Sequence, residues 1–417
     1  RLCLIVALAR LGPIPLTPHP RRLPFQAALI TTMNSDSVIN NHFAVTFDYP
    51  VHFSENAFAP ESDLLCRVFD KLGEGRRHRV ATFIDAGLAD ARPGLEEAIR
   101  HYAHAHEDAF ELAAGPIRLP GGFAVKNDNK ILQDILFHLG NLHMDRQSVV
   151  LAIGGGSLLD AVGLAASLLH RGLRLVRMPS TVLSQADAGV GVKNGVDHHG
   201  QKNFLGTFAP PFAVVNDVSL LASLPQSERL GGLAEAVKVA IIRNAEFFHQ
   251  LEHDAATLVA GDAPAMRCAI EVAANIHLRQ ICTGGDPFEF GSARPLDFGH
   301  WAGHRLEILS GHSIHHGQGV AVGMAIDTVY ANLSGLLGRA DADRIIALIK
   351  KLGLPVYLPE LEMRRPDGEL EVLRGLSDFR EHLGGRLCIT LPTAIGKTVD
   401  VHSMDDALVA QAIATVK

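Results

Sequence analysis

The segment Ser148-Val-Val-Leu-Ala-Ile-Gly-Gly-Gly-Ser-Leu-Leu-Asp160 decides the fold of this chain. Its first six residues form a continuous apolar run, which is typical of a strand buried on both faces of a parallel sheet. Three glycines close the run, and an apolar helix is predicted from Ser157 to His170. Glycines let a backbone approach a pyrophosphate closely, and a helix start supplies N–H donors. A turn without a ligand is the alternative, but Ser157 and Asp160 favour a nucleotide phosphate site.

The alternation of strands and helices extends outward from this segment in both directions. Strands are predicted over residues 79–85, 117–120, 173–178 and 212–216, with helices over 94–104 and 127–138. Such alternation predicts an α/β domain in which helices cover both faces of a parallel sheet. Past residue 227 the pattern changes to long helices, predicted over 228–244, 263–279, 300–310, 319–333 and 341–351. We therefore expect an α/β domain over 33–220 and an all-helical domain over 221–417.

Composition excludes several classes of function. The 417 residues suffice for two domains with full cores, and the net charge of -7 argues against nucleic-acid binding. Five scattered cysteines without a CxxC pair favour free thiols in a reducing cytoplasm. Residues 1–32 are apolar and then rich in Pro and Arg, and the apolar part is too short to span a membrane. We expect a poorly ordered extension there; a signal peptide is the alternative, although no small-residue cleavage site is evident.

A carboxylate and several histidines come later in the chain. Glu235, His300 and His316 form a set that suits a zinc-like divalent ion with an open coordination position. His300 and His304 are four apart and share a helix face, so spacing alone would make both of them ligands. With 22 histidines in the chain, a chance cluster is the alternative. Lys238 lies three residues after Glu235 among apolar neighbours, which favours a buried pair over an exposed one.

A polar segment lies between the glycine turn and these residues. Lys193 and Lys202 occur among small residues and are candidates for anion binding. Ser180 and Thr181 are placed to hydrogen-bond a nicotinamide ribose or ring. A dinucleotide and a metal in one chain predict redox chemistry on a polyol.

Together, several motifs resemble the sugar phosphate cyclases, the family that includes 3-dehydroquinate synthase. In chain order they are Gly154-Gly155-Gly156, Arg171-Gly172, Pro179–Leu183, Asp187 to Lys193, Gly200–Asn203, Leu233–Lys238, Phe298 to His304 and His316-Gly317. The resemblance extends from about residue 79 to residue 397. It implies a Rossmann-like domain that binds NAD, a helical domain that binds zinc or cobalt, and a homodimer with the active site between the domains.

The resemblance also implies a role for each matched residue. The implied metal ligands are Glu235, His300 and His316, so that His304 faces the substrate. NAD contacts fall to Asp85, Lys126, Gly154, Gly155, Gly156, Ser157, Asp160, Ser180, Thr181, Lys202, Ser223 and Leu224. Substrate contacts fall to Lys193, Asn203, Lys238, His304 and Lys397, and Arg171 reaches the phosphate from the other subunit. Asp187 lies where cofactor and substrate meet.

Four departures from the dehydroquinate synthase pattern indicate a different substrate. Asp297 replaces Asn, Arg279 replaces Lys, Phe123 replaces an acid near the adenosine ribose, and Ala293 replaces the Arg that holds a substrate carboxylate. An added carboxylate and a lost cation disfavour a substrate that carries a carboxylate. The segment Pro295-Leu-Asp-Phe-Gly-His300 instead resembles the branch that acts on sedoheptulose 7-phosphate and makes C7 cyclitols of the valiolone type.

The expected reaction is a cyclisation that regenerates its cofactor. A hydroxyl is oxidised, phosphate leaves by elimination, the ketone is reduced, the ring opens, and an intramolecular aldol closes the new ring, so the net reaction is that of a lyase. The alternatives are 3-dehydroquinate synthase, a metal-dependent polyol or alcohol dehydrogenase with net NADH output, and a non-catalytic binding protein. Lys193, Lys202 and Arg171 weigh against a dehydrogenase because they favour a phosphate substrate.

Overall fold

The structure is a computed structural model that describes residues 38–199, 201–291, 295–382 and 385–417. It divides into two units, residues 1–46 and the compact unit Phe47–Lys417, which contains both the sheet and the helical part. Residues 1–32, expected to be an extension, lie outside the described residues. Within the described ranges, no helix has the length and apolar character that a membrane span requires.

The N-terminal half contains a seven-stranded sheet in which every pair of strands is parallel. The strands lie in the order β1-β9-β6-β5-β2-β3, and β4 also pairs with β2. Their bounds are β1 Val51–Ser54, β2 His78–Asp85, β3 Phe110–Leu112, β4 Ile117–Leu119, β5 Val149–Gly154, β6 Arg174–Pro179 and β9 Ala213–Asp217. The apolar strand β5 lies in the interior of the sheet, between β6 and β2.

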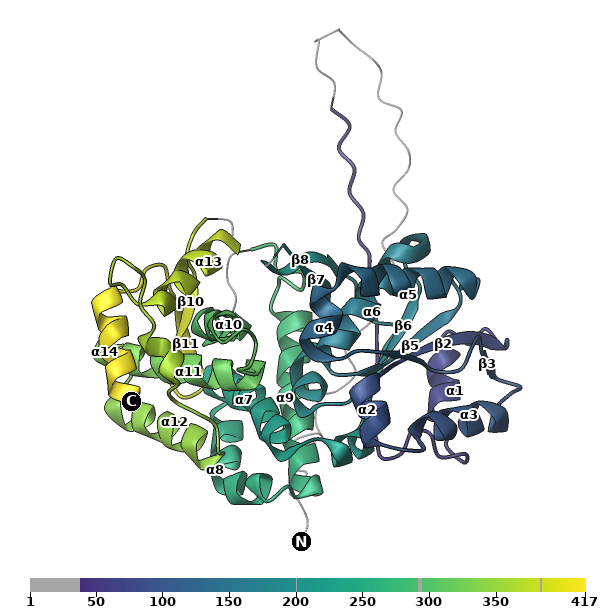
Figure 1. The fold of residues 1–417 in the computed structure, drawn as a ribbon, viewed down its shortest axis with the longest axis horizontal. Helices are drawn as coiled ribbons and strands as arrows, with labels where there is room; N and C mark the ends of the chain where they lie inside the picture. Colours follow the sequence, from purple (N-terminus) through teal and green to yellow (C-terminus); the bar gives the residue numbers. More distant parts are fainter. Residues whose placement is uncertain (1–37, 200, 292–294, 383–384) are drawn as a thin grey trace, which may run out of the picture. The chain divides into compact units, whose positions relative to one another are not determined.

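Helices cover both faces of this sheet (Figure 1). Val149, Leu151 and Ile153 belong to a core shared with α1 Leu64–Phe69, α2 Ala86–Ala91 and α3 Leu95–Ala105. The alternate residues Val150 and Ala152 belong to the opposite core, with α4 Gly122–Asn127, α5 Asn129–Asn141 and α6 Gly156–Leu168. Two-sided burial is the reason why the strands are apolar throughout, and the predicted α/β class is confirmed.

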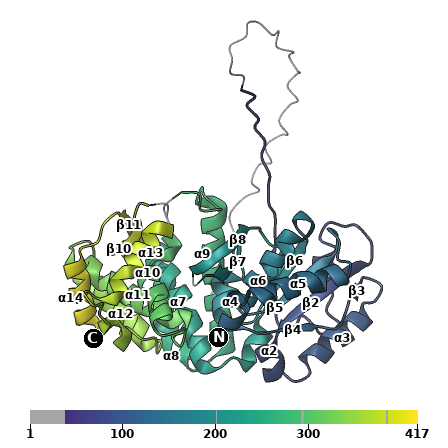
Figure 2. The ribbon, with the colours of Figure 1, turned by 45° about the horizontal axis from the view of Figure 1, so that its top comes forward.

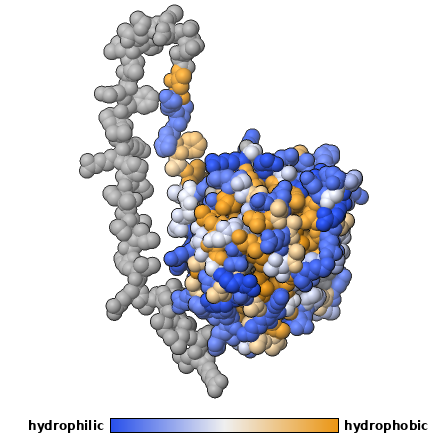
Figure 3. Space-filling view, turned by 90° about the vertical axis from the view of Figure 1, so that its left-hand side faces the viewer, coloured by the Kyte–Doolittle hydropathy of each residue, from blue (hydrophilic) through white to orange (hydrophobic). Residues whose placement is uncertain are grey.

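The C-terminal half is a bundle of helices around one apolar core. Its helices are α7 Gln226–Arg243, α8 Ala245–Val259, α9 Ala263–Thr283, α10 His300–Leu309, α11 His316–Leu333, α12 Arg339–Lys351, α13 Arg374–His382 and α14 Asp406–Val416. In both ribbon views α9 lies between the bundle and the sheet half (Figure 2), and its Ala274 packs with Val190 and Val214 of the sheet half. On the outer face of the bundle, apolar residues are interspersed with polar ones (Figure 3).

Several elements differ from the sequence-based predictions. Helix α6 begins at the third glycine, Gly156, rather than after it. The polar segment that contains both candidate anion-binding lysines forms an antiparallel hairpin of β7 Lys193–His198 and β8 Gln201–Phe208. A second hairpin, β10 Ile389–Ala394 with β11 Lys397–Val401, adds strands to the helical half, which is therefore not all-helical. Helices α8, α13 and α14 of this half were not predicted. The domain division between residues 220 and 221 stays a prediction.

Candidate active site

Two helices, α10 and α11, contribute the histidines of the site, and glycines allow them to lie in backbone contact. A methyl group on Gly303 would lie 3.0 Å from the backbone of Gly319 and Val320. A methyl group on Gly323 would overlap the carbonyl oxygen of Gly299. Gly299 directly precedes α10 and has a φ of 78°. Close approach of the two backbones brings the first residues of both helices, His300 and His316, next to each other.

Atoms that could bind one metal ion come together from Glu235, His300 and His316. Their candidate ligand atoms all lie within 4.8 Å of one another. Oε1 of Glu235 is 3.7 Å from Nε2 of His300 and 3.4 Å from Nε2 of His316. The Glu235 carboxylate is buried in α7, and neither of its oxygens has a hydrogen-bond partner among the described residues, although Oε2 forms an ion pair with Lys238. A buried carboxylate oxygen without a donor is costly unless a cation satisfies it.

Both imidazoles are oriented by hydrogen bonds at their other nitrogen. Nδ1 of His300 donates to the carbonyl oxygen of Phe298 at 3.1 Å, and Nδ1 of His316 lies 2.9 Å from Oε1 of Glu307. Hydrogen bonds at Nδ1 leave Nε2 as the nitrogen that can bind a metal, which is the usual support for a histidine ligand. The residues present therefore fit a divalent metal ion in number, chemistry and orientation.

The charges around this site also favour a cation. Burial lowers the pKa of His316, but the two carboxylates of Glu307 and Glu235 outweigh burial and raise this pKa to about 9. Burial would raise the pKa of Glu235, yet Lys238 and the histidines hold it at about 2. Burial and then the charge of Lys238 lower the pKa of His300. The ionised carboxylate and the neutral His300 ring are the protonation states that metal ligation requires.

A second group of three, His304, Glu307 and His316, shares one residue with the first. Its carboxylate is already engaged, because one oxygen of Glu307 faces His316 and the other forms an ion pair with Lys202. Burial and the charge of His300 hold the pKa of His304 well below its usual range. His304 is therefore a neutral ring beside the Glu235 group, and the Glu235 group fits the metal better.

A charged network extends from the metal group toward the sheet half. Nζ of Lys238 contacts Glu235 and lies 3.6 Å from Oδ1 of Asp187, which belongs to a π-helical turn, η2 Ser184–Ala188. Burial lowers the pKa of Lys238, but Asp187 and Glu235 outweigh it and raise this pKa. The pKa of Asp187 is lowered because Lys238 and His277 outweigh the effect of burial. Lys238 and Asp187 therefore stay charged, with Lys238 buried and Asp187 largely so, as is common at functional sites.

The glycine turn forms a second part of the site, at the carboxyl ends of the strands. Methyl groups on Gly154, Gly155 and Gly156 would lie 3.1 Å from Leu158, 3.4 Å from Thr181 and 3.2 Å from Ala188. Ser180 donates its backbone N–H to the carbonyl oxygen of Gly154 at 2.9 Å. The turn is thus close-packed and presents the first N–H groups of α6, which the helix itself cannot satisfy. It fits a pyrophosphate.

Other predicted cofactor residues surround this turn. Asp85 ends β2 and caps α2 by accepting the N–H of Leu88 at 3.0 Å. Nζ of Lys126 lies 2.7 Å from Oδ2 of Asp160 and donates to Oδ1 of Asn203 at 2.7 Å. Lys202, predicted to contact NAD, forms an ion pair with Glu307 across the two halves. Ser223 and Leu224 lie at the end of a 3-10 helix, η3 Val218–Ser223.

The remaining predicted residues lie at the edges of the site. Asp297, in η4 Pro295–Asp297, is close enough for its charge to raise the pKa of Lys238 and to oppose the lowered pKa of His300. Lys193 is paired with Glu289 at 2.6 Å. Three other predicted residues are exposed, and no described contact joins them to the metal group. They are Arg171, Arg279 and Lys397. Ala293 lies outside the described residues.

Three residues that the sequence analysis did not single out contribute to the site. Glu307 supports His316, His277 pairs with Asp187 at 2.7 Å, and Asp327 accepts hydrogen bonds from Gly299 N–H and Trp301 Nε1. Helical spacing could have found two of them, because Glu307 is three residues after His304 and Asp327 is eleven after His316. No local pattern indicates His277.

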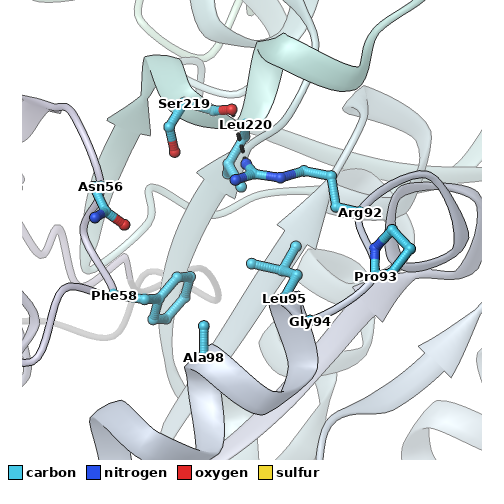
Figure 4. Close-up of a pocket in the computed structure, with 9 residues that line it drawn as sticks. All are labelled: Asn56, Phe58, Arg92, Pro93, Gly94, Leu95, Ala98, Ser219 and Leu220. Carbon is cyan, nitrogen blue, oxygen red and sulfur yellow. Dashed lines mark hydrogen bonds between the residues drawn. The ribbon is translucent and has the colours of Figure 1, made fainter.

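A cavity of about 270 Å³ lies elsewhere, beside α3 (Figure 4). Phe58, Leu95 and Leu220 line it with apolar side chains, and Arg92 donates to the carbonyl oxygen of Ser219 at 2.8 Å. None of its lining residues belongs to the predicted site.

Comparison with known families gives matches over most of the chain. The 3-dehydroquinate synthase N-terminal family matches residues 117–230, and the 3-dehydroquinate synthase C-terminal family matches residues 232–370. A 2-epi-valiolone synthase of Actinosynnema mirum is 37% identical over 386 residues, which cover 91% of this chain and 94% of the relative. A 3-dehydroquinate synthase of Geobacter sp. strain M21 is 40% identical over 245 residues, which cover 58% of this chain and 67% of the relative.

A solved structure is also similar. The 2-epi-5-epi-valiolone synthase of Streptomyces hygroscopicus subsp. jinggangensis, with NAD⁺ and Zn²⁺ bound, has a TM-score of 0.79 and 28% sequence identity. The match covers 90% of this chain and 99% of that chain.

Proposed function

Because this chain belongs to the family of 3-dehydroquinate synthase-like sugar phosphate cyclases, we propose that it converts sedoheptulose 7-phosphate to a C7 cyclitol of the valiolone type. The reaction eliminates phosphate and makes the enzyme a carbon–oxygen lyase. The relatives named above include synthases of both 2-epi-valiolone and 2-epi-5-epi-valiolone, and a 3-dehydroquinate synthase, which is the alternative function. The resident cofactors are NAD⁺ and a divalent metal, zinc or cobalt.

The observation that carries the choice of substrate is the position of Asp297. It directly precedes Phe298 and Gly299 at the start of α10, and its charge acts on Lys238 and His300. A carboxylate there accepts hydrogen bonds from sugar hydroxyls and repels a substrate carboxylate. The sedoheptulose backbone is rich in hydroxyls and carries no carboxylate, whereas the dehydroquinate precursor is a keto acid. Electrostatics therefore favour the neutral seven-carbon sugar.

The arrangement of the chain's residues suits this reaction. Glu235, His300 and His316 would hold the metal, which polarises a bound hydroxyl when present. NAD⁺ at the glycine turn would supply the hydride chemistry when bound. Lys238 and Asp187 keep fixed, opposite charges beside the reacting hydroxyls, and His304 offers a neutral ring that can take up or release a proton. Lys193 and Asn203 would bind the substrate from the sheet half, and Lys397 would bind it from the helical half.

We also propose a homodimer in which Arg171 of each subunit binds the substrate phosphate of the other. Arg171 is exposed, has a φ of 67°, and follows α6 on the sheet half. Within the described part of one chain, no contact joins it to the metal group. The scattered cysteines, which include no CxxC pair, favour the reducing cytoplasm that we propose as the location of this protein.

The test is a direct comparison of substrates with the purified protein. It should release phosphate from sedoheptulose 7-phosphate faster than from the phosphorylated keto acid that precedes dehydroquinate, with no accumulation of NADH. Nuclear magnetic resonance of the product would identify the cyclitol and its configuration. Faster turnover of the keto acid would establish the dehydroquinate synthase alternative. Stoichiometric NADH would establish a dehydrogenase.

Asp297→Asn tests the role of the charge itself. This change should lower turnover of sedoheptulose 7-phosphate by roughly one to three orders of magnitude, because an uncharged amide accepts weaker hydrogen bonds. It should not produce an efficient dehydroquinate synthase, because removing a repulsion supplies no cation for the carboxylate. Asp343→Asn is a suitable control, because Asp343 forms an exposed ion pair with Arg339 on α12. Unchanged turnover in Asp297→Asn would contradict the assignment.

A further inference from the structure

The two oxygens of the Asp187 carboxylate have different surroundings. Oδ1 faces two donors, Nδ1 of His277 at 2.7 Å and Nζ of Lys238 at 3.6 Å. Among the described residues, none donates a hydrogen bond to Oδ2. These donors therefore hold the carboxylate at Oδ1, and Oδ2 is available to a ligand.

His277 reaches this carboxylate from a different part of the fold. It lies in the middle of α9, the helix between the two halves, and its side chain is 12% exposed. Its ring is close to the turn after η2, because Nε2 is 3.5 Å from the place that a methyl group on Gly191 would take. Helix α9 packs against η2, so the ring has a fixed position relative to Asp187. A hydrogen bond between an imidazole and a buried carboxylate constrains the orientation of both groups.

We infer that His277 is a positioning residue, which holds Asp187 so that Oδ2 meets the bound cofactor and substrate. This inference rests on the proposed function, in which Asp187 lies where the two ligands meet. Without the imidazole, Lys238 would be the one donor left on Oδ1, at a distance too long for a good hydrogen bond. The carboxylate could then rotate toward Lys238, and Oδ2 would lose its fixed place.

The experiment compares two substitutions that differ in their ability to donate. His277→Phe keeps a ring of similar size but has no donor, whereas His277→Asn places an amide N–H near the position of Nδ1. His277→Phe should lower kcat by roughly tenfold or more, with a smaller change in KM, because the loss affects alignment rather than binding. His277→Asn should recover most of the loss. Metal and NAD⁺ content should match the wild type in both variants.

The chain contains a matched control for the effect of removing a histidine from a histidine–aspartate pair. Nε2 of His78 lies 3.1 Å from Oδ1 of Asp70, in the sheet half and apart from the site. His78→Phe should change stability without the selective loss of kcat.

Two results would overturn the inference. One is a His277→Phe enzyme with kcat within about twofold of the wild type. The other is a His277→Asn enzyme as slow as His277→Phe, which would assign the effect to ring packing. Failure of the proposed function is visible separately, because the wild type would then not turn over sedoheptulose 7-phosphate. The same three variants would be measured with whichever sugar phosphate the wild type does cyclise; if it cyclises none, the inference fails together with the proposed function.

Discussion

His316 lies between two carboxylates, and this determines how the site can bind a metal. Its Nδ1 is committed to Glu307, which leaves Nε2 for an ion shared with Glu235. An ion in the alternative group would have to displace either Lys202 or His316 from Glu307. The geometry therefore distinguishes the two histidines of α10, and we expect His300 to bind the metal and His304 to lie beside it.

We predict that His304→Ala retains metal and loses activity. Turnover should fall by roughly two orders of magnitude, as for the loss of a group that transfers protons. His316→Ala and Glu235→Gln should instead lose the metal. Metal content is measured by elemental analysis, and Co²⁺ binding by quenching of Trp301, which is the one tryptophan and is adjacent to His300. A metal-free His304→Ala, together with metal retained in His316→Ala, would reverse the assignment.

Asp327 gives a prediction for the dependence of stability on pH. Its carboxyl group is fully buried, and burial raises its pKa to about 7 from 3.8, against two hydrogen bonds that lower it. Between about pH 4 and 7 the folded protein keeps a proton that the unfolded chain has lost, so stability falls as pH rises through this range. From pH 5 to 8 the wild type should lose about 2–3 kcal/mol relative to Asp327→Asn.

Urea unfolding of the metal-saturated proteins at both pH values measures this difference. Asp343→Asn, which changes an exposed carboxylate, serves as the control and should follow the wild type. If the free energy of unfolding changes equally with pH in the wild type and in Asp327→Asn, Asp327 is ionised in the folded protein throughout the range.

The candidate site could be predicted residue by residue only in part. Glu235, His300 and His316 could be identified, because motif and resemblance both included them. Glu307 follows from helical spacing, since a residue three positions after His304 shares its face. His277 could not be found, because its contact with Asp187 depends on how α9 meets η2 in three dimensions.

Among the elements, the contact between α10 and α11 determines the distance between His300 and His316, the two predicted histidine ligands. Gly299 and Gly303 on one side face Gly319 and Gly323 on the other, and any side chain at these positions would separate the helices. Small residues at a helix–helix contact permit this close approach, and a well-packed interior has no space to absorb an added methyl group.

We predict that Gly323→Ala weakens metal binding as well as stability. The new methyl group would collide with the carbonyl oxygen of Gly299, so α10 must shift away from α11. The expected cost is about 1–3 kcal/mol in the free energy of unfolding, with metal affinity lowered by at least about tenfold. Gly140→Ala in α5 is the control, because a methyl group there meets nothing within 4 Å. Equal metal affinity and melting temperature for Gly323→Ala and the wild type would show that the contact is adaptable.

Elements were predictable where one physical signal dominates. The run 148–153 could be predicted to be a buried strand because it is apolar throughout, and in the structure both of its faces and both of its edges are covered. The hairpin β7–β8 was missed because its sequence is polar and rich in glycine, and β8 is largely exposed. Its strands pair through the backbone, which leaves little pattern in the side chains.

At the scale of the whole molecule, the site forms because the two halves meet. Lys202 of the hairpin pairs with Glu307 of α10, and Lys238 of α7 approaches Asp187 of the sheet half. These residues are far apart in the sequence, so their proximity could be expected only from the resemblance to the cyclase family. A local pattern determines which face of an element is buried, but not which distant element covers it.

The proposed dimer gives the last prediction, because it makes each active site depend on two chains. Arg171→Ala and Glu235→Ala should each be inactive alone, through loss of the phosphate contact and of the metal. If Arg171 acts across the interface, a mixed dimer of the two variants contains one site with an intact Glu235 and an intact partner arginine. Random mixing after unfolding and refolding together should therefore restore about one quarter of the wild-type activity. Separate refolding of each variant is the control. If mixing restores no activity although mixed dimers form, Arg171 acts within its own chain, and the phosphate site must then be assembled from one subunit.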